Sequence, residues 1–243
     1  MSLTRRRLLT TALAVPALLI AAEAIAPTEA QAYAWSRTLR EGSRGSDVTE
    51  LQIRVAGWAA DSPTRTRVAA DGVFGPATKA AVRRFQRAYG LGVDGIVGAN
   101  SQRALNALQS SDGSTTHFDF SEFHSKDGAG FSNGRISSGQ VKENVRRAMY
   151  KLEAVRRKAG DRPIRINSGF RSVAHNRAVG GVSNSQHMYG IAADIVISGL
   201  SVTATMNHAK TSGFSGILRY PTFTHVDSRV DHGYGGGGWT WHS

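Results

Sequence analysis

Apolar residues between positions 46 and 108 recur at intervals of three and four, the spacing that places them on one side of a helix. The pattern is clear in "DVTELQIRVAGW" (47–58) and "GPATKAAVRRFQRAYGL" (75–91), and weaker in "ANSQRALNAL" (99–108). Pro76 falls in the first turn of the second segment and Gly90 just past its end, as helix boundaries favour. These positions predict a small bundle of three helices.

The segments between these helices repeat one turn pattern, "DGVFG" (71–75) and "DGIVG" (94–98). In each copy Asp-Gly makes a tight bend, an apolar residue enters the core, and the second glycine lets the chain turn into the next helix.

A second pattern begins after "QSSDGSTTHFD" (109–119), whose small polar residues predict a linker over 110–116. Apolar positions from 141 to 159 predict a long amphipathic helix with a basic, solvated outer face. Short strand-like segments follow: "PIRIN" (163–167), "IAADIVI" (191–197), "GILRY" (216–220) and "TFTHVD" (222–227). One long helix followed by short strands predicts an α+β domain over 117–243, with an antiparallel sheet and flanking helices. The glycine-rich tail "GYGGGGWTWHS" is expected to be flexible chain.

Residues 1–34 do not belong to either pattern. They have a basic start, an apolar middle and small residues near Ala32 and Ala34, which predicts a signal peptide. "TRRRLLT" resembles a twin-arginine signal, with an ordinary secretory signal as the alternative. The apolar stretch 8–22 contains Pro16 and is short for a membrane span, so no stable span is expected after processing.

Composition is that of an ordinary globular protein, with 40% hydrophobic and 20% charged residues, but the charge is strongly basic. The formal net charge is +12, and removal of residues 1–34, with three arginines and two glutamates, leaves +11. Such an excess suits an anionic environment, either nucleic acid or the polyanionic wall polymers of a Gram-positive cell, and charge alone does not choose between them. No cysteine is present, so stability must come from the core or from a metal.

Two chelating side chains, His187 and Asp194, stand seven positions apart in "SQHMYGIAAD" (185–194). Alternate residues of a strand share a face, so Asp194 lies between apolar positions, where a carboxylate needs a cation or strong donors. Gly190 allows a sharp bend that can return His187 to this carboxylate. If strand 222–227 pairs beside strand 191–197, His225 reaches the same point, with Asp227 on the same face as His225.

Two imidazoles and one carboxylate leave a fourth coordination position open, which is typical of catalytic zinc, and the absence of cysteine excludes a closed thiolate site. A core histidine hydrogen-bonded to an aspartate is the structural alternative.

Both modules resemble known families. "LREGSRGSDVTELQ", "DGVFGPATKAAVRRFQRAYGL" and "DGIVGANSQRAL" resemble the three-helix peptidoglycan-binding domain of wall hydrolases, which implies such a domain over 35–109. "SQHMYGIAAD" is similar to the pattern S-x-H-x-x-G-x-A-x-D of zinc D-alanyl-D-alanine carboxypeptidases, whose superfamily includes lysostaphin-type and hedgehog domains. "NSGFRS" and "THVD" flank it in the family's order, so the match spans about 118–230.

By this resemblance His187, Asp194 and His225 bind one zinc ion per chain, and zinc-bound water attacks the carbonyl between two D-alanines. The resemblance assigns Arg171, in "SGFR", to the substrate and to the charge that develops on it. Many relatives carry an acid three residues before the last histidine, whereas this sequence has Thr222. Asp227 is therefore either the general base or an orienting partner of a ligand histidine.

Remaining candidates at the site carry less weight. Asp231 and His232 are outside candidates for the base, and His175 is expected to be a structural histidine.

The sequence thus predicts a secreted, wall-associated zinc D,D-carboxypeptidase that acts on peptidoglycan peptides ending in D-Ala-D-Ala. Anionic wall polymers are further candidate partners, while nucleic-acid binding rests on charge alone and is not expected. A D-alanyl endopeptidase that cuts cross-links, or a non-catalytic wall-binding protein with a structural zinc, are the alternatives.

Overall fold

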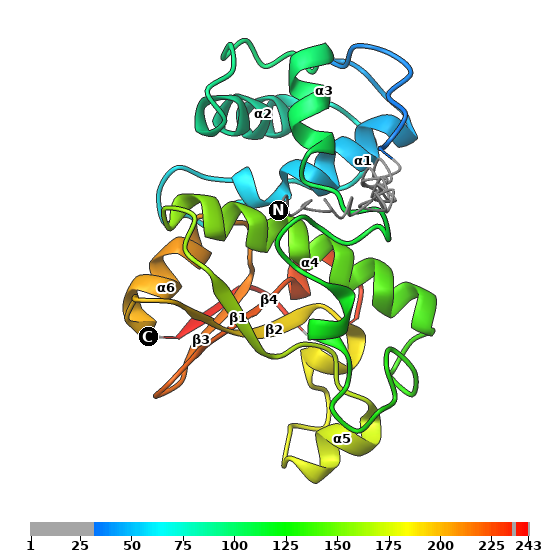
Figure 1. Cartoon of the computed structure of the whole chain (residues 1–243), viewed down its shortest axis with the longest axis vertical. Helices are drawn as coiled ribbons and strands as arrows, with labels where there is room; N and C mark the ends of the chain where they lie inside the picture. The colour runs from blue at the N-terminus through cyan, green and yellow to red at the C-terminus, as the bar shows by residue number, and fades with distance from the viewer. Residues whose placement is uncertain (1–31, 235–236, 243) are drawn as a thin grey trace, which may run out of the picture.

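The computed structural model describes residues 32–234 and 237–242, so most of the predicted signal peptide lies outside the described residues. The chain forms a helical N-terminal module and a C-terminal module built on a sheet, as the sequence predicts (Figure 1). Within residues 32–234 and 237–242, no helix combines the length and apolar character needed to cross a bilayer.

The N-terminal module consists of three α-helices and a 3-10 turn around one apolar core. The elements are α1 (Ser46–Val55), η1 (Ala56–Trp58), α2 (Pro76–Ala88) and α3 (Ala99–Asn106). Leu51, Phe74, Phe85 and Leu105 are among the buried side chains that fill this core.

Each Asp-Gly turn of this module is held by a glutamine from the preceding helix. The amide nitrogen of Gln52 donates to Asp71 Oδ1 at 2.7 Å, and its oxygen accepts from Gly72 N at 2.8 Å. Gln86 makes the equivalent bonds to Asp94 at 2.8 Å and from Gly95 at 2.9 Å. The two "DG" motifs are therefore copies of one structural unit, in which the glycines adopt positive φ angles of 74° and 78°.

The C-terminal module surrounds a sheet of five strands in the order β1-β2-β4-β3-β5. The strands are β1 (Ile164–Ser168), β2 (Ala192–Ile197), β3 (Gly216–Arg219), β4 (Thr224–Asp227) and β5 (Thr240–His242). The helical elements are η2 (Phe120–Phe123), α4 (Ser138–Lys158), α5 (Val173–Ala178), η3 (Gln186–Tyr189), α6 (Val202–Lys210) and η4 (Arg229–Asp231).

The antiparallel sheet is confirmed for β1 to β4, but β5 pairs parallel with β3. The expectation of a wholly flexible tail is therefore wrong for residues 240–242. Trp241 explains the difference, because it packs against the core of the C-terminal module and its Nε1 donates to the carbonyl of Phe214 at 3.4 Å.

Helix α4 lies between the two modules (Figure 1). One side contributes Val145, Met149 and Leu152 to the core over the sheet, and another contributes Tyr150 and Ala154 to the N-terminal core. The predicted solvated basic face is therefore wrong in part. Lys151, for example, is only 3% exposed. The spacing of apolar residues could not predict the burial of Lys151, because that spacing identifies one apolar face of a helix and α4 is buried on two faces.

The predicted linker, residues 110–116, folds into a hydrogen-bonded turn at the junction. Ser110 N donates to Ser114 O at 3.0 Å, and Thr115 forms isolated bridges with Gln109 and Phe118. Ser114 and Thr115 are buried, so this segment fixes the path of the chain between the modules.

Candidate functional site

The site forms where β2 and β4 lie side by side. Asp194 of β2 is directly opposite His225 of β4 in the antiparallel register, so both side chains leave the same face of the sheet. His187 comes from η3, and Gly190 at the end of that turn has a φ of 69°. A Cβ on Gly190 would lie 2.8 Å from the carbonyl of Val141, so only glycine lets the turn close against α4. The predicted convergence is therefore found.

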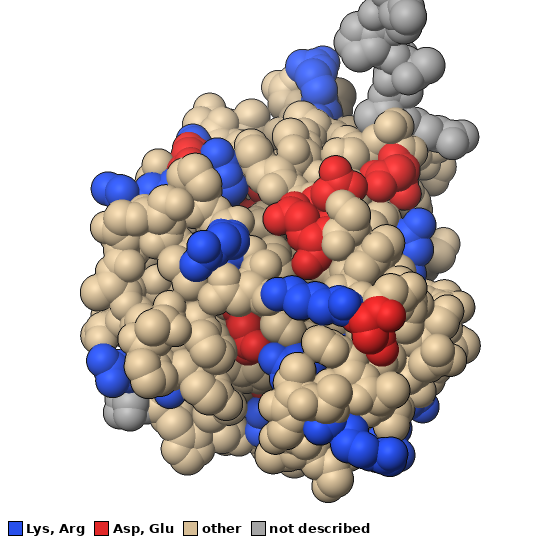
Figure 2. Space-filling view, turned by 60° about the horizontal axis from the view of Figure 1, so that its bottom comes forward, with Lys and Arg blue, Asp and Glu red and all other residues tan. Residues whose placement is uncertain are grey.

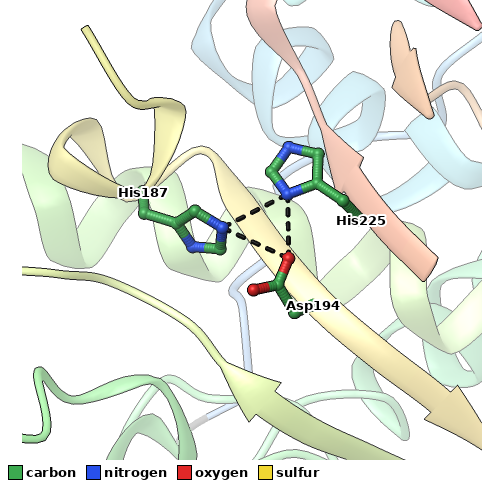
Figure 3. A group of neighbouring side chains, drawn as sticks. All are labelled: His187, Asp194 and His225. Atoms are coloured by element: carbon green, nitrogen blue, oxygen red, sulfur yellow. Dashed lines mark hydrogen bonds and ion pairs between the residues drawn. The ribbon is translucent and has the colours of Figure 1, made fainter. Parts of the chain in front are cut away.

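The three side chains point toward one another (Figure 3). His187 Nε2 lies 3.3 Å from Asp194 Oδ1, and His225 Nδ1 lies 2.9 Å from the same oxygen. The two ring nitrogens are 3.2 Å apart. All three residues are buried, and their ligand atoms lie within 4.8 Å of one another.

The outer hydrogen bonds of the two imidazoles define which nitrogens face the centre. His187 Nδ1 lies 2.6 Å from the carbonyl of Gly169, which can only accept, so Nδ1 carries the proton and Nε2 presents a lone pair. His225 Nε2 lies 3.1 Å from Asp227 Oδ2, which leaves the lone pair of Nδ1 directed inward. Two nitrogen lone pairs and one carboxylate oxygen thus converge on one point. This arrangement fits a divalent cation with N and O donors such as Zn²⁺.

Electrostatics at the cluster favour an ionised carboxylate. Burial alone would raise the pKa of Asp194, but the adjacent rings of His187 and His225, which attract the carboxylate when they are protonated, outweigh burial and lower the pKa. Burial lowers the pKa of His187 despite its carboxylate neighbour. Burial opposes a charge on His225 as well, yet the carboxylates of Asp194 and Asp227 on either side of the ring raise its pKa.

Arg171 lies beside the cluster, on the segment that follows β1. Its Nη2 donates to Asp194 Oδ2 at 2.7 Å, and its Nε donates to Ser168 Oγ at 2.8 Å. The oxygen of Asp194 that Arg171 contacts is not the one that faces the two histidines. Arg171 therefore holds the carboxylate in place, and it is also one of the residues that line the groove over the cluster.

Asp227 lies behind His225, on the side of the ring away from the cluster. Its side chain is completely buried and also accepts from Arg229, with Nε at 2.9 Å from Oδ1 and Nη2 at 2.6 Å from Oδ2. Burial would raise the pKa of Asp227, but hydrogen bonds from His225 and Arg229 lower it.

A groove runs over the cluster between the 179–186 loop and the turn joining β3 to β4. Val179, Val182 and Tyr220 are exposed by 52%, 73% and 42%, and the Tyr220 ring stacks on Phe223 at 4.5 Å. Three of the four large exposed apolar side chains found among the described residues thus line one groove. Its lining includes the cations Arg171 and Arg229. Clustered exposed apolar groups of this kind mark a binding surface.

The weaker sequence candidates lie outside this groove. Thr222 is exposed in the β3–β4 turn. Asp231 accepts from Lys151 Nζ at 2.5 Å and from Arg67 at 3.4 Å, which places it at the junction with the N-terminal module. His232 lines a pocket at the same junction, and burial lowers its pKa to about 4.

Two groups at the site, the Arg229 side chain and the carbonyl of Gly169, were not predicted from the sequence. Arg229 follows "THVD" by two residues, and an arginine just after a buried aspartate was a signal that could have been used. The carbonyl of Gly169 carries no side-chain signal, because a backbone acceptor is visible only once the fold is known.

Comparisons with known proteins match both modules. Residues 117–227 match the family model Peptidase M15, and residues 44–105 match the model of a putative peptidoglycan binding domain. A zinc D-Ala-D-Ala carboxypeptidase of Streptomyces albus G is 46% identical over 186 residues, which cover 76% of this chain and 71% of that protein.

Two further relatives match shorter stretches. A spore cortex-lytic enzyme of Bacillus cereus is 36% identical over 84 residues, 34% of this chain and 30% of that protein. The second is the crystal structure of the SleB N-terminal domain, whose sequence is 37% identical to this chain over the matched region. The match covers 29% of this chain and 90% of that chain, with a TM-score of 0.25.

Proposed function

The chain belongs to the Peptidase M15 family of zinc metallopeptidases, and from that premise we propose that it is a secreted D,D-carboxypeptidase. Its substrate would be a peptidoglycan peptide ending in D-Ala-D-Ala, the bond named for the Streptomyces albus G relative. The convergence of one ligand atom each from His187, Asp194 and His225 carries the proposal. These are the groups that would hold one zinc ion per chain.

A bound zinc ion would supply Lewis acidity and an open coordination position at the floor of the groove. The chain's own residues would do the rest. The apolar walls at Val179, Val182 and Tyr220 would contact the peptide, exclude water from it and limit how it lies over the cluster. A peptide held in this way presents its carbonyl to the open side of the site.

Arg171 would have two roles, because it holds the metal ligand Asp194 and can also bind the substrate peptide. With Nη2 on Asp194 and Nε on Ser168, its plane is fixed before any peptide arrives. The guanidinium N–H groups not used by Asp194 and Ser168 can then donate to a carboxylate or carbonyl oxygen of the peptide without reorganising.

For Asp227 the geometry favours the orienting role over the general base. The carboxylate is fully buried behind His225 and its acceptors are used by His225 and Arg229. A base must reach the proton that it removes, and Asp227 faces away from the groove. We therefore assign Asp227 to the orientation of His225, with its position defined by the hydrogen bond to Nε2.

The N-terminal module supports action at the cell wall, since residues 44–105 match a putative peptidoglycan binding domain. Anionic wall polymers are proposed as further contacts of the basic surface. Figure 2 shows that Lys and Arg side chains on one face are scattered among neutral residues, with acidic side chains gathered between them. A scattered pattern suits a wall environment better than a continuous nucleic-acid track. The basic, apolar N-terminal segment supports export.

Release of D-alanine from a peptide ending in D-Ala-D-Ala, with and without a chelator, tests this function. We expect release that stops on chelation, returns with zinc and is lost in His187→Ala, while binding to purified wall is retained. His208→Ala, on α6, is the matched control and should remain active. Zinc-loaded protein that releases no D-alanine would contradict the proposal.

Mass spectrometry of products from purified peptidoglycan defines the type of cleavage. Loss of single D-alanine residues from free stem peptides supports carboxypeptidase action. Conversion of cross-linked dimers to monomers would instead identify an endopeptidase.

A further inference from the structure

The C-terminal strand β5 is connected to the metal centre through Arg229. Thr240 is fixed in β5 because its amide donates to the carbonyl of Ser215 at 2.9 Å. Its Oγ1 accepts from Arg229 Nη1 at 3.2 Å. The neighbouring Trp241 packs against the core, which gives β5 an anchor other than Arg229.

The opposite edge of the same guanidinium grips Asp227. Nε and Nη2 donate to the two carboxylate oxygens at 2.9 and 2.6 Å, and the backbone amide of Arg229 adds a bond to Oδ1 at 3.0 Å. A bidentate contact with a further backbone bond fixes the plane of a carboxylate, which a single charge could not do.

The surroundings of Asp227 leave it little freedom. It pairs in register with Gly216 of β3, and a Cβ at that glycine would overlap the carboxylate. Its remaining contact is with His225 Nε2 at 3.1 Å. Thr240, Arg229, Asp227 and His225 therefore form a continuous chain of hydrogen bonds that begins on β5 and ends on a ligand ring.

This inference rests on the zinc site of the proposed function. We propose that Arg229 is a positioning residue for this site and that Thr240, by accepting a hydrogen bond from Arg229, keeps the guanidinium in place. Arg229 fixes Asp227, Asp227 fixes the proton of His225 on Nε2, and Nδ1 is thereby aimed at the metal. Loss of the Arg229 side chain removes the bidentate contact and leaves the carboxylate with the backbone amide of residue 229 and His225 as its partners. The carboxylate is then held less firmly, and the ring can turn or exchange tautomers. Partners that orient a ligand histidine typically contribute about 10–100-fold to metal affinity.

Zinc affinity of the purified, metal-free full chain, measured by competition with a chromophoric chelator, tests the proposal apart from peptidase activity. We expect Arg229→Gln to weaken zinc binding about 10–100-fold and Arg229→Lys to weaken it less, because lysine keeps the charge but not the bidentate contact. Thr240→Val should have a smaller effect in the same direction. Arg219→Gln, at an exposed position on β3, is the matched control and should bind zinc as the wild type does.

A second readout separates positioning from general stability. Nitrogen-15 spectra of the histidine rings at mildly alkaline pH report which nitrogen of His225 carries the proton. The Nε2-protonated form should dominate in the wild type and in Arg219→Gln, and should decline in Arg229→Gln.

Wild-type zinc affinity in a folded Arg229→Gln protein would overturn the inference. If that variant does not fold, Thr240→Val decides, and unchanged zinc affinity and tautomer in it would count equally against the proposal. Tight zinc binding without D-alanine release would defeat the proposed function and leave this inference standing.

Discussion

The metal centre and the junction between the two modules both bury charged or polar side chains, but the partners of these side chains differ. At the junction, Glu50 accepts from Arg54 at 2.7 Å and from Arg146 at 2.9 Å, and Lys151 donates to Asp231 at 2.5 Å. Donors and acceptors there come from the protein itself. At the centre formed by His187, Asp194 and His225, three acceptor atoms face one another.

This difference separates a structural site from a reactive one. Junction charges are satisfied on folding, and Lys151 also donates to the carbonyl of Gly213 and to Ser228, so nothing further is required. At the metal centre, Arg171 neutralises only the outer oxygen of Asp194. The inner atoms need a cation from outside, which makes this the part of the chain that a ligand should stabilise.

Zinc should therefore produce the largest stability change at the metal centre. Zinc at a thousandfold excess over its Kd should raise the free energy of unfolding of the wild type by about 4 kcal/mol, because the ion binds the folded chain alone. The same zinc should leave His187→Ala unchanged. Denaturant unfolding with and without zinc measures both, and an equal shift in the two proteins would place the ion elsewhere.

Breaking the junction should destabilise the protein whether or not zinc is present. Lys151→Ala leaves the carboxylate of Asp231 with only the longer contact to Arg67, so we expect a loss of about 3 kcal/mol. Lys142→Ala, on an exposed position of the same helix, should cost less than about 1 kcal/mol. Chemical unfolding compares the two, and equal losses would mean that the junction ion pair contributes nothing specific.

Close packing of the modules gives a smaller effect. A Cβ on Gly57 of η1 would overlap Ala154 of α4, so Gly57→Val should force the modules apart and destabilise by about 1–3 kcal/mol. Gly139→Ala is the control, because nothing lies within 4 Å of its Cβ position. Thermal unfolding should show a lower Tm for the first variant only, and a neutral Gly57→Val would rule out tight contact at this point.

The pH dependence of the junction should be smaller still. Burial opposes ionisation of Asp231, but Lys151 lowers its pKa below the unfolded value of about 4. Its charged form therefore stabilises the fold above about pH 4, and this contribution is lost as the pH falls through the folded-state pKa. The difference in unfolding free energy between wild type and Asp231→Asn should shrink on acidification below about pH 4. A difference that stays constant would mean that Asp231 is not held by Lys151.

Much of the metal centre could be predicted because it rests on short-range rules. Strand alternation placed Asp194 on a buried face, and the pairing of β2 with β4 then brought His225 opposite it. The repeated Asp-Gly turns likewise predicted the helical module, although not the glutamines that hold them.

The junction could not be predicted in the same way. Arg54 is 1% exposed, yet in the sequence it reads as one basic residue of an amphipathic helix. Its burial depends on Leu105 and Tyr150, which lie far along the chain. Helix α6 was also missed, since Val202, Thr203 and Thr205 near its start favour strand over helix. Packing of its later apolar residues on the sheet decides the outcome.

X-ray diffraction from crystals of the zinc-loaded protein, with anomalous data on both sides of the zinc absorption edge, tests the central claim most directly. The account predicts one anomalous peak per chain, within bonding distance of His187 Nε2, Asp194 Oδ1 and His225 Nδ1. A peak elsewhere, or three side chains that remain in mutual contact with no metal between them at saturating zinc, would contradict it.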